Sequence, residues 1–442
     1  MSINAKKSIW HILLWGNWTV ILFYWLQGSG ALLTKDIYSI AVALGRFAGL
    51  AAAMAVLTQF FFMGRMPFLE RVFGLDKLSR IHHRNGNIAF FLILFHPLLL
   101  VVGYSSFTGF SWQAQFWAMI SSTWQMAFAG VAFALFLFVV IASLTIVMKR
   151  LRYELWYFIH LAVYLAIFGS FWHQLFGTDL VANKIFYGYW IALYAVVLGS
   201  HLVFRFVMPL VRFARHKFRV SRVVREGPRA VSIYISGEAL QKFPIVPGQF
   251  MILRFLTKSR WWQAHPFSLS RPFDGKKLRI TVRELGDFTG GLKDIPVGTR
   301  VMIDGPYGVF TDFFSTSSRI LMIAGGIGIT PIRSLMEEML QKGKQVTLLY
   351  ANRTVEDAVF TDELNALASH YHANIVHIIS DDPLYAGEKG RVDAEKIARL
   401  VPDAASREIY LCGPPPMMDA IIHTLAGIGV PRNRIHFEKF SL

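Results

Sequence analysis

The chain has 442 residues, of which 54% are hydrophobic and 15% aromatic, with a mean hydropathy of +0.43. It is too apolar for an ordinary soluble protein and long enough for two or three domains. In so apolar a chain, the net charge of +17 is better explained by basic residues flanking membrane helices than by nucleic-acid binding, so no nucleic-acid partner is expected. Cys412 is the only cysteine, which excludes disulfides within the chain and cysteine-ligated iron–sulfur clusters.

Six apolar runs are long enough to cross about 30 Å of hydrocarbon. The first has no small-residue cleavage site, so we expect a retained span rather than a removed signal peptide. Lys and Arg gather in alternate loops, whereas residues 105–123 contain no Lys, Arg, Asp or Glu. The positive-inside rule therefore predicts a multi-pass protein of the plasma (inner) membrane with both termini in the cytoplasm. The runs are residues 8–27, 37–63, 81–104, 124–148, 153–176 and 184–208.

Four histidines in the third and fifth runs have matched spacing. His96 follows His83 by 13 positions, and His173 follows His160 by the same number. Both spans are expected to run from inside to outside, so His83 would face His160 at the inner end and His96 would face His173 further out. Ionisable groups in a bilayer are costly and mark function by default. Each pair would supply two neutral imidazoles to one iron, which predicts two stacked b-type haems.

The inner ligand on the third span has an alternative. At about 100° per residue, 13 steps leave a rotation of about −140°, whereas 14 steps leave about −40°. An ideal helix therefore favours His82 as the partner of His96. We take His83 as the expected ligand because it repeats the spacing of the other span, with kinks near Gly86 and Gly169 absorbing the difference.

Arg46 lies inside the second span toward the outer side, where an unpaired cation is costly. A propionate of the outer haem would be one partner. Snorkelling or a hydrogen bond to a neighbouring helix explains this arginine equally well.

The second half of the chain changes character after Arg219. Short alternating segments at residues 218–224, 230–236, 249–255 and 278–284 predict a small antiparallel β-barrel. From residue 319 onward, a strand, a glycine-rich turn, a helix and a strand predict a βαβ unit of a doubly wound parallel sheet. We therefore expect a multidomain membrane protein: a six-helix transmembrane di-haem domain (1–212), a β-barrel flavin domain (213–315) and an α/β nicotinamide domain (316–442).

Three segments, which are glycine-rich or follow a strand, are expected to bind cofactors. Residues 286–292 form a turn that opens a short helix, whose N–H groups suit a pyrophosphate. Residues 325–331 lie between a strand and a helix that Pro331 starts, a weak motif alone that its position strengthens. Residues 412–415 follow another strand, at the sheet edge where ligands bind.

These residues resemble the ferric reductase and NADPH oxidase superfamily over the whole chain. In the membrane half, the resemblance rests on residues 83–86 leading to His96-Pro97, and on 153–160 leading to His173-Gln174. In the soluble half, which is similar to ferredoxin–NADP reductase, it rests on residues 265–268, 286–289, 325–331 and 412–414, with Glu438-x-Phe440 near the C-terminus.

The resemblance implies that NADH or NADPH reduces FAD, and that single electrons then pass through the two haems to dioxygen or to a ferric or cupric chelate outside. It implies that Phe440 covers the flavin until nicotinamide displaces it. Cys412 and Glu438 would line the nicotinamide–flavin contact, although Cys412 also suits a small buried apolar position and Glu438 a surface charge. The implied cofactor contacts are His265, Pro266, Phe267, Ser268, Arg283, Gly286, Thr289, Gly325, Gly326, Gly328, Thr330, Pro331, Gly413 and Pro414.

Coenzyme choice stays open. Asp381 and Asp382 suit a free ribose hydroxyl, whereas Arg353 would serve the 2′-phosphate of NADPH. The sequence favours NADH slightly.

Two other functional classes compete with an enzyme. A haem-binding redox sensor or carrier without turnover would show haem spectra but no haem reduction by nicotinamide. A transporter whose histidines relay protons would bind no haem. The flavin and nicotinamide signatures favour the enzyme. No obligatory protein partner is evident, and constitutive activity is expected because the chain shows neither a calcium-binding loop nor a Pro-rich docking segment.

Overall fold

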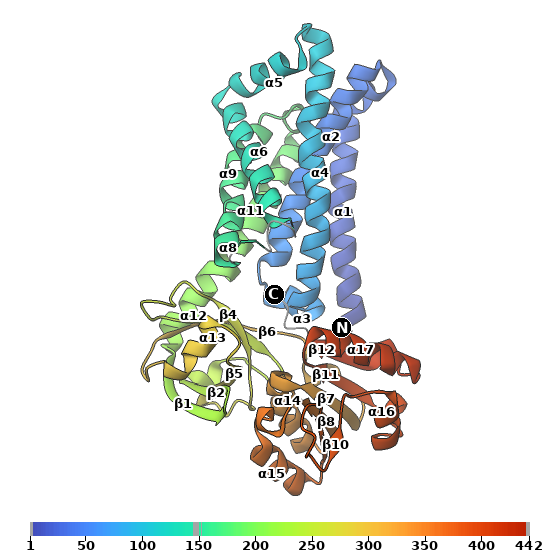
Figure 1. The fold of residues 1–442 in the computed structure, drawn as a ribbon. Coiled ribbons are helices and arrows are strands. Elements are labelled where there is room, and N and C mark those ends of the chain that lie inside the picture. Colours follow the sequence, from blue (N-terminus) through green and yellow to red (C-terminus); the bar gives the residue numbers. More distant parts are fainter. Residues whose placement is uncertain (1–2, 145–149, 152, 439–442) are drawn as a thin grey trace. The chain divides into compact units, whose positions relative to one another are not determined.

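The computed structural model describes residues 3–144, 150–151 and 153–438. The chain divides into two compact units, which are Met1–Met66 with Lys77–Arg205, and Pro67–Asp76 with Phe206–Leu442. The short segment Pro67–Asp76 therefore belongs to the second unit although it lies between two spans in the sequence. Figure 1 shows the elements of each unit.

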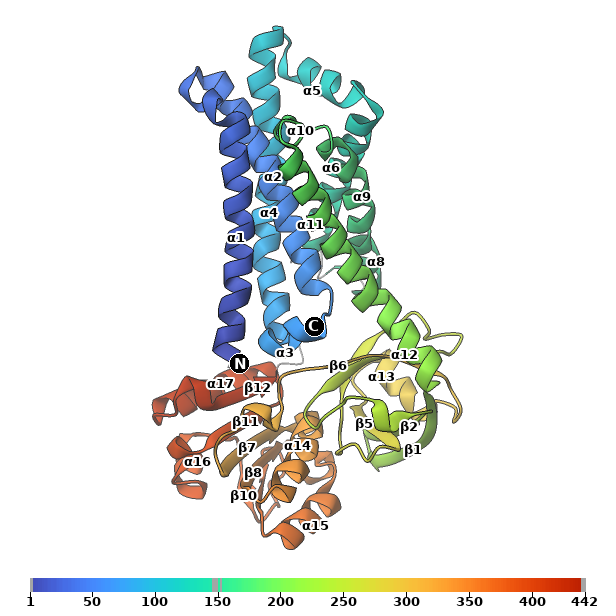
Figure 2. The same cartoon turned by 180° about the vertical axis from the view of Figure 1, so that it is seen from behind.

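The first unit is a bundle of long helices (Figures 1 and 2). In the described part of the chain, six helical stretches are long and apolar enough to cross a membrane, which confirms the predicted six-helix membrane domain. Short helices η1 (Gly30–Thr34), α5 (Trp112–Ser121) and α10 (Thr178–Val181) connect the spans. The spans are built from α1 (Ile3–Ser29), α2 (Ile37–Met63), α4 (Leu75–Thr108), α6 (Trp124–Ser143), α8 (Tyr153–Leu161) with α9 (Val163–Gln174), and α11 (Lys184–Leu202).

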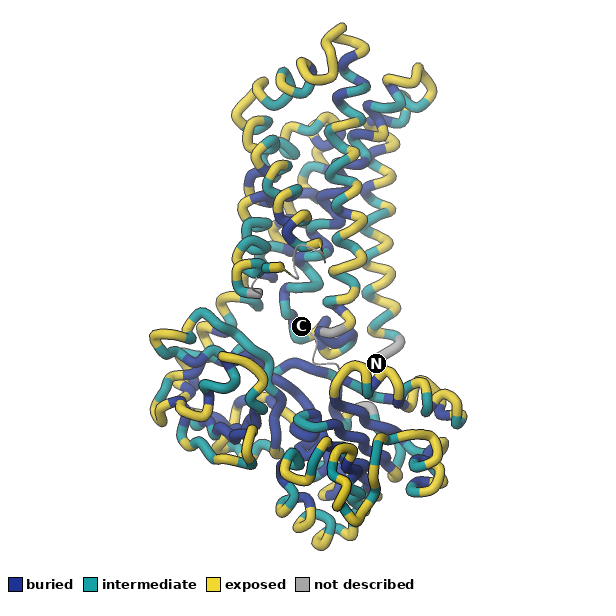
Figure 3. Tube along the Cα trace, viewed as in Figure 1, coloured by how far each residue is buried: buried dark blue, intermediate teal, exposed yellow. Residues whose placement is uncertain are grey.

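Helix α2 is the central helix of the bundle. In its most apolar window 61% of the residues are buried, against 11–22% in the other five spans. Small residues such as Gly45, Gly49 and Ala52 let neighbouring helices approach its backbone closely. Figure 3 shows many residues of the other helices as exposed, and among them are large apolar residues such as Trp15, Phe91 and Phe128, which a bilayer would cover.

Apart from the second span, the helices begin or end away from the expected limits, and two of these differences are notable. Helix α6 ends at Ser143, and residues 145–149, to which the fourth run was expected to extend, lie outside the described residues. The fifth span is two helices, because α8 ends at Leu161 and α9 begins at Val163. The break at Ala162 changes the phase of this span, which matters for its two histidines.

The second unit begins with two three-stranded antiparallel sheets, of orders β1-β2-β5 and β4-β3-β6. Isolated bridges, Arg219 with Arg300 and Leu269 with Ile280, and a few backbone hydrogen bonds such as Val301 to Phe218 join them, so the expected antiparallel barrel is present as two open sheets and not as a closed one. Strand β4 has only four residues, too few for a continuous ladder to a second neighbour. The strands are β1 (Arg219–Gly227), β2 (Ala230–Ser236), β3 (Phe250–Phe255), β4 (His265–Ser268), β5 (Lys277–Arg283) and β6 (Val301–Tyr307).

A six-stranded parallel sheet of order β10-β9-β8-β7-β11-β12 follows, as the βαβ pattern predicted. Apolar clusters fill both faces of this sheet, beneath α14 (Ile329–Gln341), α15 (Thr361–Tyr371), α16 (Ala394–Leu400) and α17 (Pro415–Gly427). The strands are β7 (Arg319–Gly325), β8 (Gln345–Asn352), β9 (Asn374–Ile379), β10 (Glu388–Lys389), β11 (Glu408–Cys412) and β12 (Ile435–Glu438).

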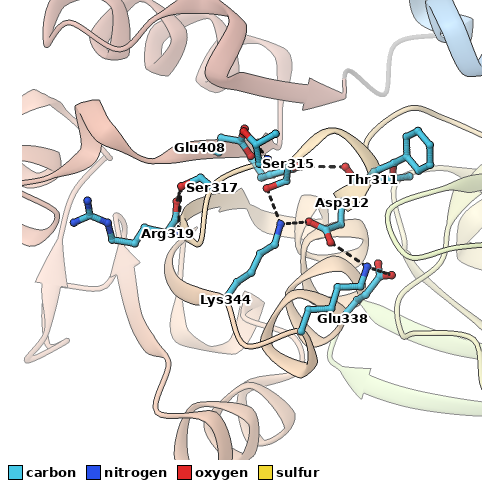
Figure 4. Close-up of polar contacts among 12 residues, drawn as sticks. Thr311, Asp312, Ser315, Ser317, Arg319, Glu338, Lys344 and Glu408 are labelled. Atoms are coloured by element: carbon cyan, nitrogen blue, oxygen red, sulfur yellow. Dashed lines mark hydrogen bonds and ion pairs between the residues drawn. The ribbon is translucent and has the colours of Figure 1, made fainter. Parts of the chain in front are cut away.

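Polar side chains hold the connection between β6 and β7 against this sheet (Figure 4). Lys344 donates to Asp312 and, over 2.7 Å, to the hydroxyl of Ser315, while the backbone N–H of Thr316 donates to Glu408 over 3.3 Å. Because Asp312 and Lys344 are largely buried, these bonds are little screened by solvent. These bonds hold in place the segment that connects the antiparallel sheets to the parallel sheet.

Candidate functional site

The inner histidine pair consists of His82 and His160. Their ring centroids are 6.0 Å apart, and Trp156 stacks on His160 at 5.4 Å. The Nδ1 atom of His82 is buried without a hydrogen-bond partner in the described chain. His83 is exposed, so the expectation that His83 faces His160 was wrong.

Helical phase explains this correction. Helix α4 is continuous from Leu75 to Thr108, so its 100° steps bring His82, 14 positions before His96, to nearly the same face. In the fifth span the break at Ala162 alters the helical phase between its two histidines. His160 and His173 can therefore lie on the same face although they are 13 positions apart. The equal spacing in the two spans is therefore not the sign of a shared ligand register.

The outer pair, His96 and His173, has ring centroids 6.3 Å apart. The Nδ1 atom of His96 lies 2.8 Å from the carbonyl oxygen of Gly45, which can only accept, so Nδ1 carries the proton and Nε2 is left as an acceptor. Gly49 makes room for this ring, because a Cβ there would lie 2.6 Å from its Nδ1. Nδ1 of His173 is buried without a partner in the described part of the chain.

A cavity of about 600 Å³ lies beside the outer pair and is lined by His96, His173 and mainly apolar side chains. Arg46 also lines it. Its guanidinium donates to the hydroxyl of Tyr104 over 3.1 Å and to that of Ser29 over 3.4 Å, so the helix–helix hydrogen bonds that were one explanation for this arginine are present. Asp179, which accepts from Ser29 over 2.7 Å, completes the polar edge of the cavity.

The predicted flavin-binding segment lies on β4 and on the turn after β5. The rings of His265 and Phe288 are in close contact, with centroids 3.9 Å apart and planes tilted by 31°, while Pro266 and Phe267 are half-buried. Ser268 is buried, and its hydroxyl has no partner among the described residues.

The turn after β5 is closed by Thr289. Its hydroxyl accepts from the backbone N–H groups of Leu285 and Gly286, over 3.0 and 3.2 Å. The side chain of Thr289 therefore stabilises the turn through hydrogen bonds to its backbone.

Arg283 ends β5 and reaches the glycine-rich turn after β7. Its guanidinium donates to Asp357 over 2.8 Å, and Arg229 donates to the same carboxylate over 3.0 Å. Gly326 has φ +52°, and a Cβ there would lie 3.2 Å from the Arg283 guanidinium. No sequence pattern indicated Asp357, the residue that orients this arginine.

The two nicotinamide-type turns pack backbone against backbone. A Cβ on Gly328 would overlap the carbonyl oxygen of Cys412 and lie 2.8 Å from the nitrogen of Gly413. A Cβ on Gly413 would lie 3.2 Å from the Cα of Gly325. Thr330 donates to the carbonyl of Ile327 over 3.0 Å, and Pro331 continues α14, so both close the turn into the helix. Pro414 precedes the first residue of α17.

Cys412 and Glu438 are neighbours in the parallel sheet. They are register partners on β11 and β12, and the Cys412 thiol lies 3.8 Å from the carbonyl oxygen of Glu438. Burial, with the Glu438 charge nearby, raises the pKa of the Cys412 thiol well above its usual value. Glu438 is 9% exposed, so it is not a surface charge. Phe440 lies outside the described residues.

An ion network of two buried arginines and a partly exposed glutamate, which sequence reasoning missed, joins the antiparallel sheets to the helices of the parallel sheet. Glu363 of α15 accepts from Arg279 of β5 over 2.6 and 3.0 Å and from Arg333 of α14 over 2.8 Å. Burial alone would raise the pKa of Glu363, but the Arg279 hydrogen bond and the charges of both arginines lower it. Such long-range pairs leave no local pattern in a sequence.

Arg353, the expected phosphate ligand, pairs instead with Asp381. Its Nε donates to the Asp381 carboxylate over 2.6 Å, and Ser380 donates to the other carboxylate oxygen over 2.7 Å. The two residues proposed for opposite coenzymes therefore neutralise each other at an exposed position.

Comparisons with known proteins match the chain in three parts. Residues 48–171 match the ferric reductase like transmembrane component family, residues 213–311 an FAD-binding domain and residues 322–423 the oxidoreductase NAD-binding domain. The division into domains at 212 and 315 stays a prediction.

Two relatives and one solved structure illustrate the similarity. The ferredoxin reductase component of 3-ketosteroid-9-alpha-monooxygenase from Rhodococcus rhodochrous is 33% identical, over 50% of this chain and 64% of the relative. The reductase component of propane 2-monooxygenase from Rhodococcus jostii (strain RHA1) is 36% identical, over 50% and 63%. A ferredoxin reductase in carbazole 1,9a-dioxygenase is 26% identical, over 51% of this chain and 68% of that one, with a TM-score of 0.46.

The chain spans less than two thirds of the length of those two curated relatives. The three family matches lie in the order that the sequence motifs predicted. The chain therefore joins a ferric reductase like transmembrane component to an FAD-binding domain and an oxidoreductase NAD-binding domain.

Proposed function

We propose that the protein is a transmembrane oxidoreductase of the flavocytochrome b type. It takes electrons from cytoplasmic NADH or NADPH, holds FAD and two stacked b-type haems, and delivers the electrons to an acceptor on the outer side of the plasma (inner) membrane. When bound, these cofactors supply the conversion of a hydride into single electrons and their relay through the bilayer.

The observation that carries the proposal is the separation within each histidine pair. A metal ion held between two opposed imidazoles, at about 2 Å from each nitrogen, separates the ring centroids by roughly 6 Å. The measured separations are 6.0 Å for His82 with His160 and 6.3 Å for His96 with His173. Across the described residues no cluster of three or more His, Cys, Asp or Glu side chains suits a bare metal ion, so each site offers two imidazoles only. This donor set suits an iron whose other ligands come from a porphyrin.

The surroundings of the histidines support the same assignment. The carbonyl of Gly45 fixes the His96 tautomer that presents Nε2, and a metal-bound imidazole commonly donates its other N–H to a carbonyl in this way. The cavity of about 600 Å³ beside His96 and His173 is within the usual size range of cofactor sites, about 300–1,000 Å³. Arg46 at its edge would hold a propionate while keeping Tyr104 as a neighbour.

In the soluble half, the chain's own residues would orient the flavin and the nicotinamide. The unpartnered hydroxyl of buried Ser268 would bond to the flavin ring system. The turns at Gly325–Gly328 and at Gly413 bring bare backbone close to a bound dinucleotide. Buried Cys412 and Glu438 would exclude water from the contact between the two rings, and Phe440 would cover the flavin.

In the part of the outer cavity that a bound haem would leave open, the lining favours a small uncharged acceptor, and we propose dioxygen. Arg46 and Asp179 are the charged residues of the described lining, and both are already bonded to Ser29. An anionic ferric or cupric chelate would need further charged groups to bind there. Reduction of a metal chelate is the second candidate reaction, and the experiment must distinguish it from reduction of dioxygen.

A spectral and kinetic assay of purified protein loaded with FAD and haem tests this function. We expect sharp cytochrome b bands in the dithionite-reduced minus oxidised spectrum, two haems per chain, and anaerobic haem reduction by NADH or NADPH. In air, we expect acceptor reduction that superoxide dismutase abolishes.

The other results distinguish the alternatives. Absence of cytochrome bands from loaded protein would end the proposal. Bands without reduction by nicotinamide would indicate a sensor or carrier, and anaerobic reduction of a ferric chelate with a dismutase-insensitive signal would indicate a metalloreductase.

Replacing Asp381 with Asn should shift coenzyme preference toward NADPH, because it releases Arg353 for the 2′-phosphate. An exposed ion pair contributes little free energy, so we expect the NADPH to NADH ratio of kcat/KM to rise only about 3- to 5-fold. Asp382→Asn is the comparison variant: it removes a neighbouring carboxylate that accepts from the N–H of Leu384, without releasing Arg353, so the ratio should rise less than in Asp381→Asn. An unchanged ratio in Asp381→Asn would show that Arg353 does not contact the coenzyme.

A further inference from the structure

A buried glutamate sits in the short helix between the second and third spans. Helix α3 (Pro67–Phe73) carries Glu70, which is only 2% exposed. Its carboxylate accepts a hydrogen bond of 2.6 Å from the backbone N–H of Gly308, a residue 238 positions later in the chain. A buried carboxylate is costly unless such bonds hold it, so this contact is a specific one.

Apolar packing fixes the segment around Glu70 to the sheet β4-β3-β6. Leu75, which begins α4, is buried in one cluster with Phe250 and Ile252 of β3 and Tyr307 of β6. Because Pro67–Asp76 groups with the second unit, this packing lies within that unit. The loop that links two membrane spans is thus built into the flavin-type domain.

Gly308 connects this loop to the proposed nicotinamide–flavin contact. Its φ of +101° suits glycine, and its carbonyl accepts from the side chain of Gln249 over 3.3 Å. A Cβ on Gly308 would lie 3.1 Å from a carboxylate oxygen of Glu438, the register partner of Cys412. Glu70 and Gln249 therefore hold the two sides of one peptide turn that borders Glu438.

We propose that Glu70 is a positioning residue for the nicotinamide–flavin contact, acting through Gly308 on Glu438. This inference rests on the proposed function. A side chain from the membrane half of the sequence thus holds the turn that borders the site where the hydride is transferred. Loss of the Glu70 acceptor leaves a buried N–H unsatisfied and lets the turn beside Glu438 move, which lowers the rate of hydride transfer more than nucleotide affinity.

Anaerobic stopped-flow measurement of flavin reduction in the full-length, FAD-loaded protein tests the proposal. Across a range of NADH concentrations, Glu70→Ala should lower the limiting rate about 10-fold and change the half-saturating concentration less than 2-fold. Glu70→Gln keeps an acceptor oxygen and should stay within about 3-fold of the wild type. Arg71→Gln removes an exposed charge from the same helix and should behave as the wild type.

The outcomes separate this inference from the proposed function. If the wild type reduces its flavin and Glu70→Ala, with normal FAD content, does so equally fast, Glu70 is not a positioning residue and the proposed function stands. If the wild type does not reduce its flavin with either nucleotide, the proposed function fails. Should Glu70→Ala not fold, Glu70→Asp decides, because it keeps the charge but withdraws the acceptor; an unchanged limiting rate there would overturn the inference.

Discussion

Replacing His82 with alanine is expected to remove about half of the bound haem and to stop electron delivery to the outer acceptor. The ring of His82 lies 6.0 Å from that of His160, and its loss leaves the inner iron with one imidazole. Haem content per chain, measured from the pyridine haemochrome, and the rate of acceptor reduction give the result. Flavin reduction by NADH should survive, since the residues proposed for it lie in the other unit.

His83→Ala is the matched control for this prediction. It removes an imidazole from the adjacent position of the same helix, but one that is exposed. Haem content and acceptor reduction should equal those of the wild type. Loss of haem in His83→Ala with retention in His82→Ala would reverse the assignment and restore the ligand expected from equal spacing.

Much of the architecture was predictable because it follows from regular patterns. Long apolar runs and basic loops indicate six spans, and alternating strands with glycine-rich turns indicate the two sheet types. The helix break at Ala162 was not predictable, since alanine is a strong helix former and no glycine or proline stands there. Because the break could not be foreseen, the equal spacing of the histidines led to His83 as the inner ligand. Helical phase along α4 alone pointed to His82.

Residues that act through long-range contacts could not be found from the sequence. Glu70 meets Gly308 across 238 positions, and Glu363 meets Arg279 across 84. Arg353 and Asp381 were each assigned to a coenzyme, but only the fold reveals that they bond to each other. The motif residues, in contrast, could be assigned because their chemistry depends on local turns.

The second large effect is expected from Gly328→Ala. The φ of Gly328 is −59°, which alanine adopts without strain, so the only obstacle is space. The added Cβ would overlap the carbonyl oxygen of Cys412 and lie 2.6 Å from its carbonyl carbon. Because these are backbone atoms, the turns after β7 and β11 must separate. A displacement of about 1 Å at a reacting site costs about 100-fold in rate, so we expect flavin reduction by NADH or NADPH to fall about 100-fold.

Comparison with a second glycine decides whether crowding is the cause. Gly427 ends α17, and a Cβ there would meet no atom within 4 Å, so Gly427→Ala should reduce its flavin at the wild-type rate. In Gly328→Ala, FAD content and haem reduction by dithionite should be retained, because the turns that separate belong to the parallel sheet and not to the flavin-type sheets. Flavin reduction at the wild-type rate in Gly328→Ala would show that close packing of the two turns is not required, and the proposed nicotinamide site would then have to lie elsewhere in this domain.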